Sequence, residues 1–371
     1  MSEIVLYPSN WLYNAGVIGF LYSLELVENK SSKIYLSNEG VSRIPCDLFM
    51  DLNCDYRYFS PNKIASIVGN NVLYKNFLQP NQKELFKSFV RSLNLVTSRK
   101  ICNLCGSGKW LPEDKIADLN QQDPARRNDT KFLYRIENFS MIHNSFLGPS
   151  LNEFTNAFWG LKQSATVCHL CSFLIIHHHL ALTSLSDDSE IFINAPSFKV
   201  MWYLNKFARE VFGTFSSAEA RTKREILAMS VIEYATKIQT TLGVWTGMNI
   251  EIVSRRRSEI EFFSLPYEVI QLLADRRIAS LLSQIGEFAV LNLVLAQDFS
   301  RLMELGYRLL RIGLKPYGER GDSENRFVND ILKLDKNRRD PQQAAEQIFQ
   351  LCALIEEKRK RRYTYEHASF I

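Results

Sequence analysis

Two cysteine pairs, far apart in the chain, constrain its fold more than any other feature. Cys102 and Cys105 lie in ICNLCGSGKW, and Cys168 and Cys171 lie in SATVCHLCSFL. Each pair has the C-x-x-C spacing that lets two thiolates bind one metal ion, and two pairs complete the tetrahedral four-thiolate set of structural zinc sites. We therefore predict a structural zinc ion at these four cysteines, which ties together the two ends of residues 106–167.

The predicted metal site argues against catalysis. Zinc held by four cysteines has no open coordination position for substrate or water. The sequence also has no P-loop, no G-x-G-x-x-G, no G-x-S-x-G and no H-x-E ahead of a cysteine pair, as a zinc deaminase would need. We therefore expect a protein that is not an enzyme.

The cysteine usage and the first residues favour a cytoplasmic location. C-x-x-C pairs that bind metal are typical of a reducing compartment, and MSEIVLYPSN lacks a basic segment followed by an apolar one. The stretch closest to a membrane span, residues 278–296, contains Ser283, Gln284, Glu287 and Asn292. A buried bundle helix is therefore expected there, and no membrane contact.

The apolar pattern predicts an α+β fold in which a mixed N-terminal body precedes a mainly α-helical C-terminal bundle. We assign the body to residues 1–245, with a lobe at 106–167, a basic β-hairpin to 246–264 and the bundle to 265–371. The length of 371 residues allows this division and a sizeable core.

Several local patterns fix individual elements of the body. Ser9 is the predicted N-cap of a helix that is apolar on nearly all sides, and Gly16 and Gly19 within it indicate close approach of another backbone. Alternating residues predict strands at 33–40 and in IFINAP.

The bundle is predicted from helical periodicity alone. No strand pattern returns after Pro266, and the expected helices span residues 266–280, 281–297, 298–313, 323–335 and 341–362.

The histidines are not expected to form a second metal site. His177, His178 and His179 are neighbours, and neighbouring side chains of a helix point in different directions. His169, between the cysteines of the second pair, is expected to be an exposed spacer.

Basic residues gather at a few loops, where they can neutralise nucleic-acid phosphates. Arg126, Arg127 and Lys131 lie in a polar stretch between the cysteine pairs, and Lys109 follows the first pair. The predicted hairpin tip holds Arg255, Arg256 and Arg257. For the arginines of the bundle, a solvated helix face is an equally good explanation, because acidic residues nearly balance them.

The order of these features resembles a known family. WLYNAGVIGFL near the start, then two distant C-x-x-C pairs and a helical C-terminal bundle, resemble the CXXC–CXXC group of CRISPR-associated large subunits from type I (I-B-like) Cascade interference complexes. The resemblance implies a subunit that contacts the crRNA 5′ handle and neighbouring backbone subunits. It also implies reading of the target-flanking motif (PAM) in duplex DNA and help in unwinding.

The resemblance further implies that the bundle corresponds to the small subunit, which can be produced separately by internal initiation, with Met248 or Met229 as possible starts. The resemblance also implies a downstream partner, which is either a helicase-nuclease or a transposition factor.

No motif identifies the residues that read DNA, so these are nominated by side-chain chemistry. Polar groups in loops can reach base edges in the grooves of a duplex. The candidates near the first cysteine pair are Asn103, Lys109, Arg126, Arg127, Asn128 and Lys131. Two other functions stay open at this point: a zinc-ribbon nucleic-acid enzyme such as a nuclease, and a scaffold that binds only protein.

Overall fold

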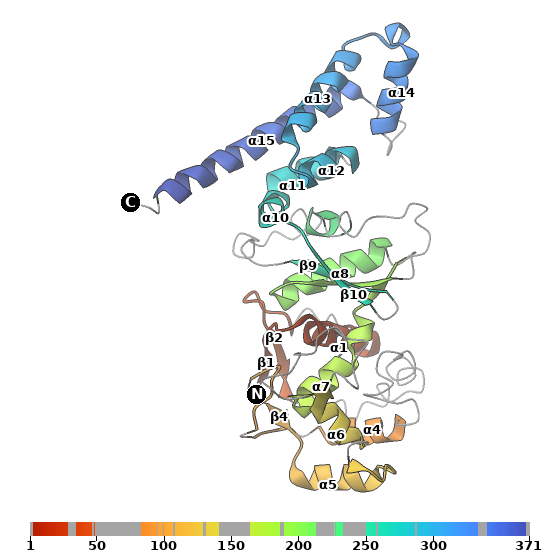
Figure 1. Cartoon of the computed structure of the whole chain (residues 1–371), viewed down its shortest axis with the longest axis vertical. Coiled ribbons are helices and arrows are strands. Elements are labelled where there is room, and N and C mark those ends of the chain that lie inside the picture. The colour runs from red at the N-terminus through yellow and green to blue at the C-terminus, as the bar shows by residue number, and fades with distance from the viewer. Residues whose placement is uncertain are drawn as a thin grey trace. The chain divides into compact units, whose positions relative to one another are not determined.

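The protein is an α+β molecule with two compact units, as the computed structural model shows (Figure 1). One unit comprises Met1–Ser216 and Ile252–Phe262, and the other comprises Ser217–Glu251 and Phe263–Ile371. The structure describes residues 3–28, 35–46, 48, 83–93, 95–98, 100–106, 108–128, 131–140, 164–185, 189–212, 226, 228–232, 250–256, 259–285, 288–332 and 340–368.

The predicted fold class is confirmed, because a four-cysteine cluster lies in the mixed first unit and the second unit carries the C-terminal helices. The unit boundaries differ from the predicted division. Most of the hairpin groups with the first unit, and residues 217–245 group with the second.

The first unit contains short sheets and helices. Its helices are α1 (Trp11–Glu28), α4 (Lys83–Arg91), α5 (Glu113–Gln122), α6 (Phe132–Glu137), α7 (His169–Ile176), η7 (His178–Leu180) and α8 (Phe198–Phe212). Its two-stranded sheets pair β1 (Glu3–Leu6) with β2 (Ser42–Pro45), β3 (Val96–Thr97) with β4 (Lys109–Trp110), and β5 (Asn138–Ser140) with β6 (Ser164–Thr166).

Helix α1 packs against α7 with the two backbones almost in contact. A Cβ on Gly16 would lie 2.6 Å from the carbonyl oxygen of Leu174, and one on Gly19 would overlap the carbonyl oxygen of His177. The prediction from these glycines is therefore confirmed.

The N-cap of α1 is Asn10 and not the predicted Ser9. Asn10 Oδ1 accepts a hydrogen bond from the Tyr13 amide at 3.0 Å. Ser9 instead donates from its hydroxyl to the carbonyl oxygen of Leu104, beside the first cysteine pair. The start of α1 is thereby linked to that pair.

The four-stranded sheet has the strand order β10-β9-β8-β7. Its strands are β7 (Thr183–Ser184), β8 (Glu190–Asn194), β9 (Glu251–Arg256) and β10 (Glu259–Ser264). The hairpin and the strand in IFINAP are thus confirmed. The strand predicted at 33–40 is wrong for the residues described there, because the chain turns at Gly40 (φ 86°) and the strand follows as β2.

The described part of the second unit is a helical bundle with no strand after Ser264. Its helices after Ser264 are α10 (Tyr267–Leu273), α11 (Arg276–Ile285), α12 (Phe288–Leu295), α13 (Phe299–Gly313), η9 (Tyr317–Glu319), α14 (Asp322–Ile331) and α15 (Pro341–Ala368). The helix predicted at 266–280 is in fact two helices, because Asp275 lies between them and its Oδ1 accepts from the Arg277 amide at 3.0 Å.

Helices α13 and α15 run antiparallel and pack through glycines. A Cβ on Gly306 would lie 2.9 Å from the Phe349 ring, and one on Gly313 would lie 2.7 Å from the backbone nitrogen of Gln342. None of the helices in the described ranges combines the length and apolar composition that crossing a membrane requires.

The backbone contact of α1 makes Gly19 intolerant of a side chain. We expect Gly19→Ala to destabilise the first unit by roughly 1–3 kcal/mol, because a Cβ forced against backbone cannot be relieved by a rotamer change. Gly318→Ala is the matched control, since nothing lies within 4 Å of its Cβ position. Urea unfolding of both variants measures the difference, and equal midpoints would contradict the packing described for α1.

Candidate metal centre

The structure brings the four predicted ligands into one cluster. The sulfur atoms of Cys102, Cys105, Cys168 and Cys171 all lie within 4.8 Å of one another. Cys105 Sγ and Cys168 Sγ are 3.8 Å apart. Cys105 is partly exposed, and the other three are buried.

Backbone amides point at the sulfur atoms of the first pair. The Leu104 and Cys168 amides donate to Cys102 Sγ at 3.4 and 3.3 Å, and the Gly108 amide donates to Cys105 Sγ at 3.3 Å. Gly108 has a φ of 81°, in the left-handed region that favours glycine. Such N–H···S bonds stabilise negative charge on sulfur, so the local backbone suits thiolate ligands.

The closeness of the thiols perturbs their ionisation. Hydrogen bonding with Cys102 lowers the pKa of Cys105, whereas contact with Cys102 and Cys105 raises the pKa of Cys168. Four thiolates at this spacing repel one another, and a divalent cation between them removes the repulsion. The donor set therefore fits a metal ion such as zinc, held with no open coordination position.

Helix α1 lies beside the cluster. Tyr13 is 1% exposed, and its pKa is raised first by burial and then by the negative charge of the four cysteines. The helix that contacts α7 through its glycines thus also covers the cysteine site.

Asn103 joins the two cysteine segments. Its amide donates to the carbonyl oxygen of Thr166 at 2.8 Å, and its Oδ1 accepts from the Thr166 amide at 2.7 Å. The side-chain oxygen of this nominated DNA contact is therefore engaged within the metal centre.

His169 is not the exposed spacer expected from the sequence. It is 0% exposed, because α7 begins at His169 and directs this ring inward. Its Nδ1 accepts from the Leu111 amide at 2.9 Å, and its Nε2 lies 2.9 Å from Glu137 Oε1. The other oxygen of Glu137 pairs with Lys100 Nζ at 2.9 Å.

The charge on Glu137 is favoured by its neighbours. Burial raises the pKa of this carboxyl, but contacts with His169 and Lys100 outweigh burial, so the pKa lies below its ordinary value. Sequence patterns gave no sign of this pair, because its two members lie on different helices that only the fold brings together.

The nominated cations between the cysteine pairs lie in a loop anchored at its base. Asp123, 8% exposed, accepts from the amide of Ala125 through Oδ1 and from that of Phe132 through Oδ2. Residues Arg126, Arg127 and Asn128, which we call the cationic loop, are exposed between these anchor points.

The remaining nominated lysines contact neighbouring segments. Lys131 Nζ donates to the carbonyl oxygen of Asn120 at 3.5 Å, and Lys109 Nζ donates to Thr97 Oγ1 at 2.7 Å. Both side chains are partly exposed.

The hairpin arginines do not all lie at the tip. Strand β9 extends through Arg256, so Arg255 is a strand residue, with 20% of its side chain exposed, and it pairs with Glu190 at 2.8 Å. Arg256 is exposed, and Arg257 lies outside the described residues. The expectation of three arginines at the tip is thus wrong for Arg255.

The histidine run belongs to the core of the first unit. His177 and His178 are 0% exposed, and their Nδ1 atoms contact the carbonyl oxygens of Phe173 and Ile175. Among the described residues, the four cysteines form the only cluster suited to a metal ion.

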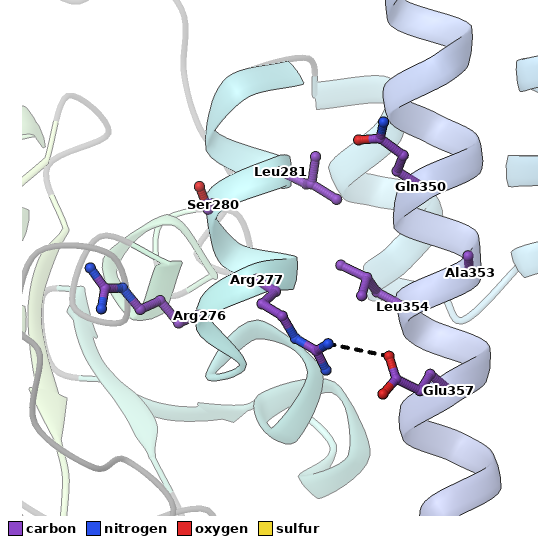
Figure 2. Close-up of a pocket in the computed structure, with 8 residues that line it drawn as sticks. All are labelled: Arg276, Arg277, Ser280, Leu281, Gln350, Ala353, Leu354 and Glu357. Atoms are coloured by element: carbon purple, nitrogen blue, oxygen red, sulfur yellow. Dashed lines mark hydrogen bonds and ion pairs between the residues drawn. The ribbon is translucent and has the colours of Figure 1, made fainter.

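The arginines of the bundle mostly contact its own residues. Arg277 pairs with Glu357 at 3.3 Å in a shallow groove between α11 and α15, where Arg276 points away from α15 (Figure 2). Arg301 pairs with Asp298 at 3.5 Å, and Arg308 lies over the Phe327 ring. These contacts favour the explanation that such arginines form a solvated helix face and interact with other residues of the bundle.

Comparisons with protein-family models, curated proteins and solved structures gave no match to this chain.

The cluster geometry predicts a bound metal that depends on each cysteine. We expect about one zinc ion per chain, and its loss in Cys102→Ser together with partial unfolding of the first unit. Cys46→Ser is the control, because Cys46 is a free cysteine outside the cluster. Elemental analysis and circular dichroism measure both effects. A metal-free Cys102→Ser chain with unchanged stability would contradict a structural role for the site.

Burial of His178 predicts sensitivity to acid. Burial lowers the pKa of His178 well below its ordinary value of 6.5, and His179 and Arg255 lower it further. Below pH 6.5 His178 binds a proton in the unfolded chain but stays neutral in the folded chain. The contribution of His178 to the free energy of unfolding is therefore fully present above this pH and decreases as the pH falls.

We expect His178→Asn, which can still donate to the Ile175 carbonyl oxygen, to reduce this loss between pH 7 and pH 5. Urea unfolding at several pH values measures it. An identical pH dependence in the variant and the wild type would show that His178 is not responsible.

Proposed function

We propose that this protein is the non-catalytic large subunit of a crRNA-guided DNA-surveillance complex of the type I-B-like Cascade kind. One observation carries the proposal: a closed four-cysteine centre in an α+β body that holds an exposed cationic loop between its two cysteine pairs. A helical bundle follows this body, in the order that the large subunits have.

The metal in this proposal is zinc, and its role is structural. Four thiolates are the usual donor set of structural zinc, and their closed coordination supplies no position for a reacting group. Binding, not bond cleavage, is then the activity of the chain.

The proposed ligand of the cationic loop is duplex DNA beside the target, including the PAM. Arg126 and Arg127 can neutralise phosphates and can donate two hydrogen bonds to a guanine edge. Asn128 can form a pair of hydrogen bonds with an adenine edge. Asn103 and Arg255 are weaker candidates than the sequence indicated, because each is engaged within the protein. Lys109 and Lys131 also contact neighbouring segments, but each ammonium group has three donors and only one of them is used there. Together with Arg256, they are proposed to add phosphate contacts.

The other proposed partners follow from the same assignment. They are the crRNA, the backbone and 5′-handle-binding subunits, and copies of a small subunit related to the bundle. Met248, one possible internal start, lies outside the described residues, and Met229 lies in a helical segment at 228–232. A helicase-nuclease or a transposition factor acts downstream.

Co-expression of the tagged chain with its neighbouring genes tests the proposal. We expect a small discrete RNA and further protein subunits to copurify. In that complex, Arg126→Glu combined with Arg127→Glu leaves assembly intact but weakens binding of target duplex, and the salt slope falls by about 0.9 for every phosphate that is no longer neutralised. Binding is measured by fluorescence anisotropy across salt concentrations.

Arg301→Glu is the matched surface control, because Arg301 is also an exposed arginine, 75% exposed, but lies on α13. Unchanged duplex affinity in the loop variant would favour a protein-binding scaffold. Metal-dependent cleavage of DNA by the purified chain would contradict a non-catalytic role.

A further inference from the structure

The pair formed by Glu137 and His169 links the cysteine centre to the lobe between the two cysteine pairs. His169 directly follows Cys168 in the chain and is 0% exposed. Because the Leu111 amide donates to Nδ1, the ring proton resides on Nε2, the nitrogen that faces Glu137 Oε1 at 2.9 Å. One ring thus joins the segment after β4, the end of α6 and the start of α7.

The end of α6 holds both sides of the second cysteine pair. The carbonyl oxygen of Glu137 accepts from the Val167 amide at 2.9 Å, just before Cys168. The carbonyl oxygen of Ile136 accepts from the Ser172 hydroxyl at 2.7 Å, just after Cys171. The direction of the two thiols therefore depends on where α6 ends.

The beginning of α6 holds the cationic loop. The amide of Phe132, the first residue of α6, donates to Asp123, which anchors the loop. Since α6 is a short helix, an interaction that fixes its last residue also restrains its first. The side chain of Glu137 is 18% exposed. Water therefore screens the interactions of its carboxylate with His169 and Lys100 only weakly.

We propose that Glu137 and His169 are positioning residues that orient the cysteine ligands for the metal and hold the cationic loop in place. Neither residue is a metal ligand. The pair fixes the start of α7 and thereby Cys168 and Cys171, and through α6 it fixes Asp123 and the loop. This inference rests on the metal-binding part of the proposed function and is independent of the nature of the nucleic acid.

Zinc affinity and loop proteolysis of the full-length chain test this role. Glu137→Ala lowers zinc affinity by about 10- to 100-fold, as removal of a group that orients ligands does elsewhere, measured by competition with a chromophoric chelator. Trypsin cleaves after Arg126 and Arg127 about tenfold faster in this variant, because loss of a charged partner raises the open population of the lobe.

Two further variants separate positioning from general destabilisation. Glu137→Gln loses less zinc affinity than Glu137→Ala, because its amide oxygen can still face the Nε2–H of His169. Glu113→Ala, which removes an exposed carboxylate from α5 in the same lobe, changes neither zinc affinity nor cleavage.

The outcomes are distinguishable. Wild-type zinc affinity and cleavage rates in Glu137→Ala, or equal losses in Glu113→Ala, would overturn the positioning role while leaving the metal centre in place. A wild-type chain that binds no zinc would overturn the metal centre itself and this proposal with it.

Discussion

The convergence of four sulfur atoms is the constraint on which the first unit depends. Because the four sulfur atoms lie within 4.8 Å of one another, the segment with Cys168 and Cys171 must return to the segment with Cys102 and Cys105 after the intervening lobe. The Asn103–Thr166 hydrogen bonds and the pairing of β5 with β6 make that return without metal. Contact with Cys102 and Cys105 raises the pKa of Cys168, so this thiol resists ionisation without a cation, whereas a divalent metal ion would let all four sulfur atoms bind as thiolates. Backbone pairing brings the four cysteines together, and a bound metal ion would stabilise the charge of their thiolates.

Helix α1 packs against α7, the helix that carries Cys171. Gly16 and Gly19 let this helix approach the backbone of Leu174 and His177, at the end of the helix that carries Cys171. Tyr13, on the same helix, is buried beside the cysteines. Since close-packed backbones cannot shift independently, a displacement of α1 would move the second cysteine pair. The sequence WLYNAGVIGFL thus serves packing against the metal centre as well as burial of its own side chains.

The sequence predicted features whose cause lies within a few neighbouring residues. The C-x-x-C spacing, the glycines of α1, the hairpin and the helix at 298–313 carry their signals locally. It did not predict contacts with distant partners. The contacts of His169 with Glu137, of Asn103 with Thr166 and of Arg255 with Glu190 have no signal in the sequence. Periodicity carries no information about such pairs, because they form only when the helices and strands are packed.

These long-range contacts also change which residues suit a nucleic acid. Arg255 must lose its pairing with Glu190 before it can contact a phosphate, and that loss offsets part of the gain. Arg126, Arg127 and Asn128 are exposed on a loop whose ends are fixed by Asp123. A loop anchored in this way loses less conformational entropy on binding than a free segment of the same length. The anchoring carboxylate, which no sequence pattern indicated, therefore supports the proposal that the cationic loop, and not Arg255, contacts duplex DNA.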